Sequence, residues 1–124
     1  MTLKELYSLI EGNYDQAVRI MRMDKMISRY LLKLKDNPAR DRLMAAGEAM
    51  DPTQLFEAAH ALKGVCANLG LDALSQAASD IAEEFRPGSP RKHSDAEVKA
   101  MLEKADALYQ KFLSGIQQYE ANPQ

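Results

Sequence analysis

The chain has 124 residues, 46% hydrophobic and 27% charged, which suits one domain with a core and a solvated surface. Its 16 basic and 18 acidic side chains leave a net charge of −2, which excludes a strongly basic nucleic-acid footprint over the whole chain. A single cysteine excludes an internal disulfide, and no apolar run suits a membrane span or a secretory leader. We expect one soluble, cytoplasmic, monomeric domain over residues 1–124 that binds neither nucleic acid nor membrane.

Apolar residues in the N-terminal half recur at spacings of three and four, which predicts helices and no strands. A short helix is expected over about 2–11, before the core bundle over about 23–120. A second helical run is interrupted at Asn37-Pro38, and a third covers about 39–50. The second run carries its apolar side chains at Met26, Ile27, Tyr30, Leu31 and Leu34.

The start and end of the next helix have local signals. Asp51 suits an N-cap and Pro52 the first helical position. The helix is expected to reach about Leu69, with Gly70 as a left-handed stop. The apolar stripe of the helix that follows is Leu74, Ala77, Ala78, Ile81 and Phe85.

Residues 86–93, RPGSPRKH, offer no apolar side chain to bury, so we expect an exposed loop with solvated basic side chains, His93 among them. Ser94 and Glu97 have the spacing of a capping box and open a long last helix. Four long amphipathic helices with short connections predict an all-α fold, an antiparallel four-helix bundle with additional short N-terminal helices.

The helix after Pro52 carries a histidine on its polar side. On a helical wheel, His60 lies about 150° from the centre of the apolar arc and is expected to face water. Gly64 follows one turn later, and Lys63 flanks the same face. A glycine inside a helix costs about 1 kcal/mol relative to alanine, so Gly64 indicates a need for open space. The apolar arc is made by Leu55, Ala59, Leu62, Cys66 and Leu69.

An exposed, unpaired imidazole is suited to nucleophilic attack on phosphorus. In its neutral form, imidazole keeps a free lone pair on one ring nitrogen. The ammonium of Lys63 would meet phosphoryl oxygens, a contact worth about 1 kcal/mol at about 4 Å in water. The space at Gly64 would admit the acidic pocket of a partner that brings the phosphoryl group.

The run His60-Ala61-Leu62-Lys63-Gly64, with Gly70 behind it, resembles the H-x-L-K-G signature of histidine-containing phosphotransfer (HPt) domains. The flanking segments DPTQLFEAAHALKG and LGLDALSQAASDIAEEF resemble the two central helices of that family. The resemblance implies that His60 accepts a phosphoryl group from an aspartate of a response-regulator receiver domain and passes it to another. It implies that Lys63 supports the phosphate and that Gly64 gives access.

The resemblance also implies partners and cofactors. Receiver domains and a hybrid histidine kinase would be the partners, and the receiver would supply Mg²⁺. The chain would be a phosphocarrier with no cofactor, metal or ATP site of its own, and therefore no enzyme. The partner is expected to cover the residues around His60 on the wheel, which are Glu57, Ala61, Ala67 and Asn68.

One position departs from the family pattern. An amide or acidic side chain often stands near the phosphohistidine where this chain has Ala82, which cannot hydrogen-bond the imidazole. Glu83 and Arg86 are candidates to replace it. An alternative function also stays open, a docking module that binds and inhibits a receiver or kinase without being phosphorylated. The joint presence of His60, Lys63 and Gly64 favours the phosphorelay.

Overall fold

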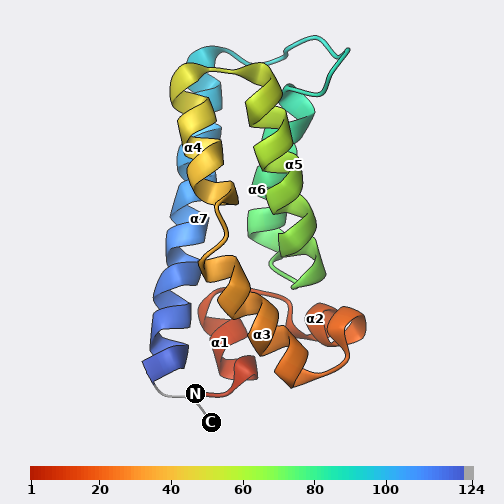
Figure 1. The fold of residues 1–124 in the computed structure, drawn as a ribbon, viewed down its shortest axis with the longest axis vertical. Coiled ribbons are helices and arrows are strands. Elements are labelled where there is room, and N and C mark those ends of the chain that lie inside the picture. The colour runs from red at the N-terminus through yellow and green to blue at the C-terminus, as the bar shows by residue number, and fades with distance from the viewer. Residues whose placement is uncertain (122–124) are drawn as a thin grey trace.

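The computed structural model describes residues 1–121, and the end of the predicted domain, 122–124, lies outside them. All regular structure in the described residues is helical, which confirms the all-α prediction (Figure 1). The helices are α1 (Leu3–Leu9), α2 (Tyr14–Met21), α3 (Asp24–Lys35), α4 (Ala39–Ala49), α5 (Pro52–Asn68), α6 (Asp72–Glu84) and α7 (Asp95–Ala121).

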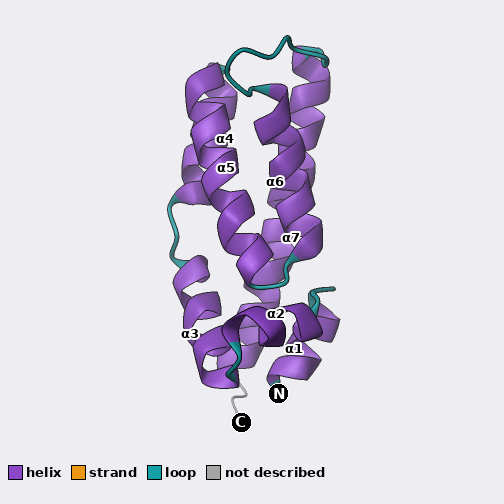
Figure 2. Cartoon of the chain, turned by 90° about the vertical axis from the view of Figure 1, so that its right-hand side faces the viewer, coloured by secondary structure: helices purple, strands orange, loops and turns teal. Residues whose placement is uncertain are grey.

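The helical bundle is built from the last four of these helices. α4 packs on α5, α5 on α6 and α6 on α7, and α7 returns to contact α4. α7 has 27 residues and is therefore about 40 Å long. It continues past α4 to contact α3 and α1, so the N-terminal helices gather at one end of the bundle (Figures 1 and 2). One continuous apolar core runs between the helices.

The predicted interruption at Asn37-Pro38 separates α3 from α4. The Asn37 side chain accepts a hydrogen bond from Ala39 N at 2.8 Å, which satisfies an amide that the helix start leaves open. The hydroxyl of Tyr109 on α7 donates to the Leu34 carbonyl at 2.7 Å, at the end of α3. The α3 side of the break is therefore held against α7, and the α4 side is capped locally by Asn37.

The sequence analysis placed no helix where α2 lies. α2 buries only Ala17 fully, but Tyr14, Ala17, Val18 and Met21 form a short apolar stripe with helical spacing that packs against the core. Two local signals were thus overlooked, this stripe and Asn13, an N-cap whose side chain accepts from Gln16 N at 3.0 Å. Asn13 N also donates to the Gly70 carbonyl at 2.7 Å, which ties α2 to the turn after α5.

Both ends of α5 form as predicted. The Asp51 side chain accepts from Gln54 N at 3.2 Å, and Pro52 occupies the first turn. Gly70 has a φ of +68°, and a Cβ there would lie 2.2 Å from Asn13 O, so only glycine fits this turn. Tyr7 adds a tether, because its buried hydroxyl donates to the Leu69 carbonyl at 2.7 Å.

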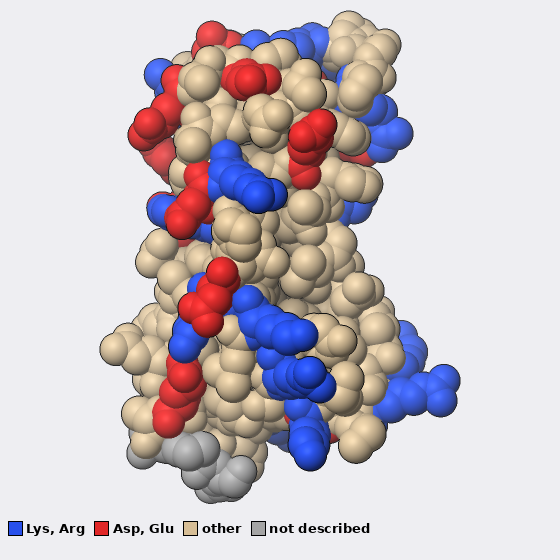
Figure 3. Space-filling view, viewed as in Figure 1, with Lys and Arg blue, Asp and Glu red and all other residues tan. Residues whose placement is uncertain are grey.

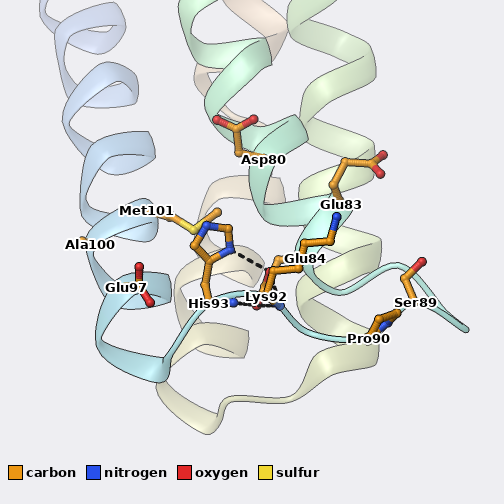
Figure 4. A pocket seen from close by; sticks show the side chains of 10 residues that line it. All are labelled: Asp80, Glu83, Glu84, Ser89, Pro90, Lys92, His93, Glu97, Ala100 and Met101. Carbon is orange, nitrogen blue, oxygen red and sulfur yellow. Dashed lines mark hydrogen bonds and ion pairs between the residues drawn. The ribbon is translucent and has the colours of Figure 1, made fainter.

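The loop over residues 86–93 is anchored on a buried carboxylate. Glu84, 4% exposed, accepts hydrogen bonds from His93 N and His93 Nδ1, each at 2.8 Å (Figure 4). It also accepts one from Arg91 Nε at 3.3 Å. The amide of Lys92 donates to the same carboxylate at 3.2 Å. Burial alone would raise the pKa of Glu84, but these hydrogen bonds outweigh it and lower the pKa to about 2. Arg91 and His93 are exposed, as expected of a solvated loop, and they also pair with Glu84, which was not predicted.

The His93–Glu84 contact predicts a pH-dependent stability. The hydrogen bond to Glu84, followed by the charges of Glu84, Glu97 and Asp80, raises the pKa of His93 above 6.5 in the folded chain. The charge-dependent stabilisation is then fully present below about pH 6.5 and is lost as the pH rises through the raised pKa. His93→Gln is expected to lower the melting temperature more at about pH 5.5 than at about pH 8.5. Thermal unfolding followed by circular dichroism measures this, and a difference that does not change with pH would contradict it.

Candidate functional site

α5 is oriented as the helical wheel predicted, with its apolar side in the core and His60 facing solvent. His60 is exposed in the middle of the helix, while Leu55, Leu62 and Cys66 on the opposite side are at most 1% exposed. Because α5 packs on both α4 and α6 and is tethered at its C-terminal end, this rotation is fixed by the core. His60 therefore sits on a rigid support with its imidazole in solvent.

The imidazole of His60 makes one ring contact. It stacks on Phe56, one turn earlier, with 5.5 Å between ring centroids and 16° between ring planes. Neither ring nitrogen has a hydrogen-bond partner among residues 1–121. Phe56 was not predicted as a site residue, although an aromatic residue four positions before His60 lies on the same side of the helix. Both nitrogens are thus open to a partner from solution.

Lys63 lies on the α6 side of His60. The hydrogen bonds from Arg86 lower the pKa of Glu83 most, and the charges of Arg86, Lys63 and Lys92 add to this effect. Lys63 nevertheless forms no ion pair within the described residues. Its backbone is held, because Ser75 Oγ on α6 donates to the Lys63 carbonyl at 3.1 Å. A fixed backbone with an unpaired ammonium suits a residue that meets an incoming anion.

Gly64 is exposed, and a Cβ built on it would meet no atom within 4 Å. Gly115, which lies within α7, differs, because a Cβ there would collide with Ile10 Cγ2 and lie 3.2 Å from Leu6 Cδ1. Close helix packing therefore explains Gly115 and does not explain Gly64. What glycine provides at position 64 is open space beside His60.

The other residues of the predicted partner face are exposed in the structure. Their role in binding a partner stays a prediction. Apart from His60, α5 carries one acidic and one basic side chain, Glu57 and Lys63, whereas exposed lysine and arginine side chains gather over α3 (Figure 3). The surroundings of His60 are thus formed largely by small and uncharged residues. The exposed members of the predicted face are Glu57, Ala61, Ala67 and Asn68.

No side chain of α6 hydrogen-bonds the imidazole in place of the family's polar residue. Ala82 is 2% exposed and belongs to the core. Glu83 and Arg86, the two candidates to replace it, form an ion pair with each other. Orientation of the His60 ring in this chain does not come from a hydrogen bond to α6.

Other reactive groups in the described residues do not form a second site. Cys66 is fully buried, and burial raises the pKa of its thiol to about 12, so it is no nucleophile at neutral pH. Within residues 1–121, no group of three or more His, Cys, Asp and Glu side chains is arranged to hold a metal ion. The hollow in Figure 4 does not include His60, and the acids Asp80, Glu83 and Glu97 on its wall disfavour a phosphoryl anion. No helix in the described part is both long and apolar enough to cross a membrane.

A comparison with known protein families identifies the family of the chain. The model of the Hpt domain family matches residues 27–111, and the chain belongs to that family. The match covers α4, α5 and α6 completely and reaches into α7. No curated protein and no solved structure matched the chain. As an Hpt domain it is a phosphotransfer module of two-component phosphorelay signalling, a class of phosphocarriers that interacts with receiver domains and kinases.

The glycine geometry predicts opposite effects of the same substitution at two sites. Gly64→Ala is expected to raise the free energy of unfolding by up to about 1 kcal/mol, since it gains helix propensity and meets no atom. Gly115→Ala is expected to lower it, because α1 must move away from α7 to accept the methyl group. Urea unfolding of both variants measures the two values. A loss of stability in Gly64→Ala would show that position 64 is packed.

Proposed function

We propose that this chain is a phosphorelay intermediate, in which His60 accepts a phosphoryl group from a receiver-domain aspartate and passes it to a second receiver. The exposed, unpaired imidazole on a helix fixed in the core is the observation that carries the proposal. We take α4 to α7 as the antiparallel four-helix bundle that supports it, acting as a monomer. A hybrid histidine kinase would supply the first receiver.

The proposed step is an in-line transfer between two side chains. The lone pair of one His60 ring nitrogen attacks phosphorus, and an N–P bond forms as the P–O bond to the aspartyl oxygen breaks. The electron pair of that bond leaves with the aspartate carboxylate. The second ring nitrogen of His60 keeps its proton, so the phosphorylated ring carries a positive charge. Mg²⁺ held by the receiver's acidic pocket would neutralise phosphoryl oxygens.

Lys63 and Gly64 would assist from the same side of α5. The ammonium of Lys63 is unpaired and would meet the phosphoryl oxygens, a contact worth about 1 kcal/mol at a wet surface. Gly64 leaves open space in which the rim of the receiver pocket can approach the imidazole. The receiver would then rest on the small exposed residues Ala61 and Ala67, flanked by Glu57 and Asn68.

His60→Gln is expected to abolish labelling when the chain is mixed with a phosphorylated receiver and Mg²⁺. Glutamine keeps a polar side chain of similar reach but removes the nucleophile, so folding and receiver affinity should stay near wild type. His93 is the second of the two histidines, and His93→Gln is the matched control that should keep full labelling. The label should be acid-labile and base-stable, as expected for a P–N bond.

The same experiment separates the two candidate functions. A wild-type chain that binds receivers tightly and never acquires label at His60 would be a docking module that blocks its partner by occupancy. That outcome would overturn the relay. Label that persists in His60→Gln would overturn the assignment of the acceptor.

Lys63→Ala is expected to slow transfer by up to about tenfold without abolishing it, because it removes charge and leaves the attacking atom. Lys99→Ala, which removes an exposed lysine from α7, is the matched control and should transfer at the wild-type rate. Rapid-quench measurement of the transfer rate gives both values. Equal rates in the two variants would show that Lys63 does not contact the phosphoryl group.

A further inference from the structure

The orientation of the His60 ring needs a physical cause. In-line attack requires that a lone pair in the plane of the imidazole point at phosphorus, so a freely rotating ring would spend little time in a reactive orientation. No hydrogen bond within residues 1–121 holds either ring nitrogen. Ala82 is buried and apolar, and Glu83 is paired with Arg86. The stacking partner Phe56 is the ring contact that remains.

Phe56 is placed to act as a fixed platform. It is partly buried and packs against the core, so its own ring is held from below. Long side chains on a helix lean toward the N-terminus, which lays the His60 ring over the turn that contains Phe56. The rings lie 16° from parallel with 5.5 Å between centroids, which is an offset stack. Both nitrogens lie on the ring's edge, where their in-plane lone pairs stay open to solvent.

The stacking contact between Phe56 and His60 becomes stronger when the reaction places a positive charge on the imidazole. Attack on phosphorus turns the neutral imidazole into a positively charged ring, since the second nitrogen keeps its proton. The face of an aromatic ring attracts a cation within about 6 Å of its centroid. The contact between Phe56 and His60 is therefore stronger in the phosphorylated state than in the free one. An interaction that strengthens along the reaction raises its rate and shifts its equilibrium.

We propose that Phe56 is a positioning residue for the phosphoacceptor: its ring holds the His60 imidazole edge-outward and stabilises the positive charge that develops on it. This inference rests on the proposed function. It assigns Phe56 a role in the transfer step and none in recognition of the receiver.

Phe56→Leu tests the proposal, because leucine keeps an apolar side chain of similar size against the core and removes the aromatic face. The rate of phosphoryl transfer at saturating phosphorylated receiver is expected to fall about two- to tenfold, with an unchanged KM for the receiver. Phe56→Tyr keeps the face and should restore the wild-type rate. Phe112→Leu is the matched control, since it removes a core aromatic that pairs with Tyr109 and not with His60. It should lower stability while the folded protein transfers normally.

A spectroscopic measurement accompanies the kinetics. Ring-current shielding by Phe56 should displace the His60 ring-proton NMR resonances in the wild type, and Phe56→Leu should return them toward solvent-exposed values. Unchanged resonances, or an unchanged turnover rate in a wild type that transfers, would overturn the positioning role and leave the proposed function standing. A raised KM with an unchanged turnover rate would overturn it too, by making Phe56 a docking contact. A wild-type chain that never becomes labelled would overturn the proposed function, and this inference with it.

Discussion

Burial of one apolar stripe on α5 is the constraint on which the candidate site depends. With Leu55, Leu62 and Cys66 packed into the bundle, the geometry of the helix leaves no position for residue 60 except the solvent side. Tethers at the end of the helix, from Tyr7 to the Leu69 carbonyl and from Asn13 to the Gly70 carbonyl, prevent α5 from rotating. The chain thus presents an exposed imidazole on a rigid surface, with no cleft around it.

A surface nucleophile of this kind divides the chemistry between two proteins. In the proposed transfer this chain supplies the imidazole, the ring that supports it and a nearby ammonium, and the receiver supplies the phosphoryl group and its metal ion. Two features of the structure are consistent with this division of the chemistry. Gly64 leaves space where a side chain would block approach, and Lys63 forms no ion pair within the described residues that would compete with phosphate.

Features determined by short stretches of sequence could be predicted, and those determined by distant contacts could not. The cap at Asp51, the stop at Gly70 and the capping box of Ser94 and Glu97 each depend on neighbouring residues, and all three occur in the structure. The anchored loop depends on Glu84, which no pattern in residues 86–93 reveals, whereas α2 was missed although its N-cap, Asn13, is a local signal.

The candidate site also combines features that local sequence determines with features that depend on packing. The exposure of His60 followed from the helical period, and the open space at Gly64 followed from the cost of a mid-helix glycine. The i, i+4 spacing from Phe56 to His60 was readable, but stacking is one of several arrangements this spacing permits, and side-chain geometry was needed to select it. The buried position of Ala82 likewise depends on how α6 packs in the bundle.

Amide chemical shifts measured before and after phosphorylation test the central claim most directly. The phosphoryl group is expected to attach to His60, and the shifted amides are expected to cluster on the outward side of α5 and the facing turn of α6. The core amides of Leu62, Cys66 and Ile81 should keep their positions, because the support is rigid. Attachment at His93, or shifts that spread through the core, would contradict the account.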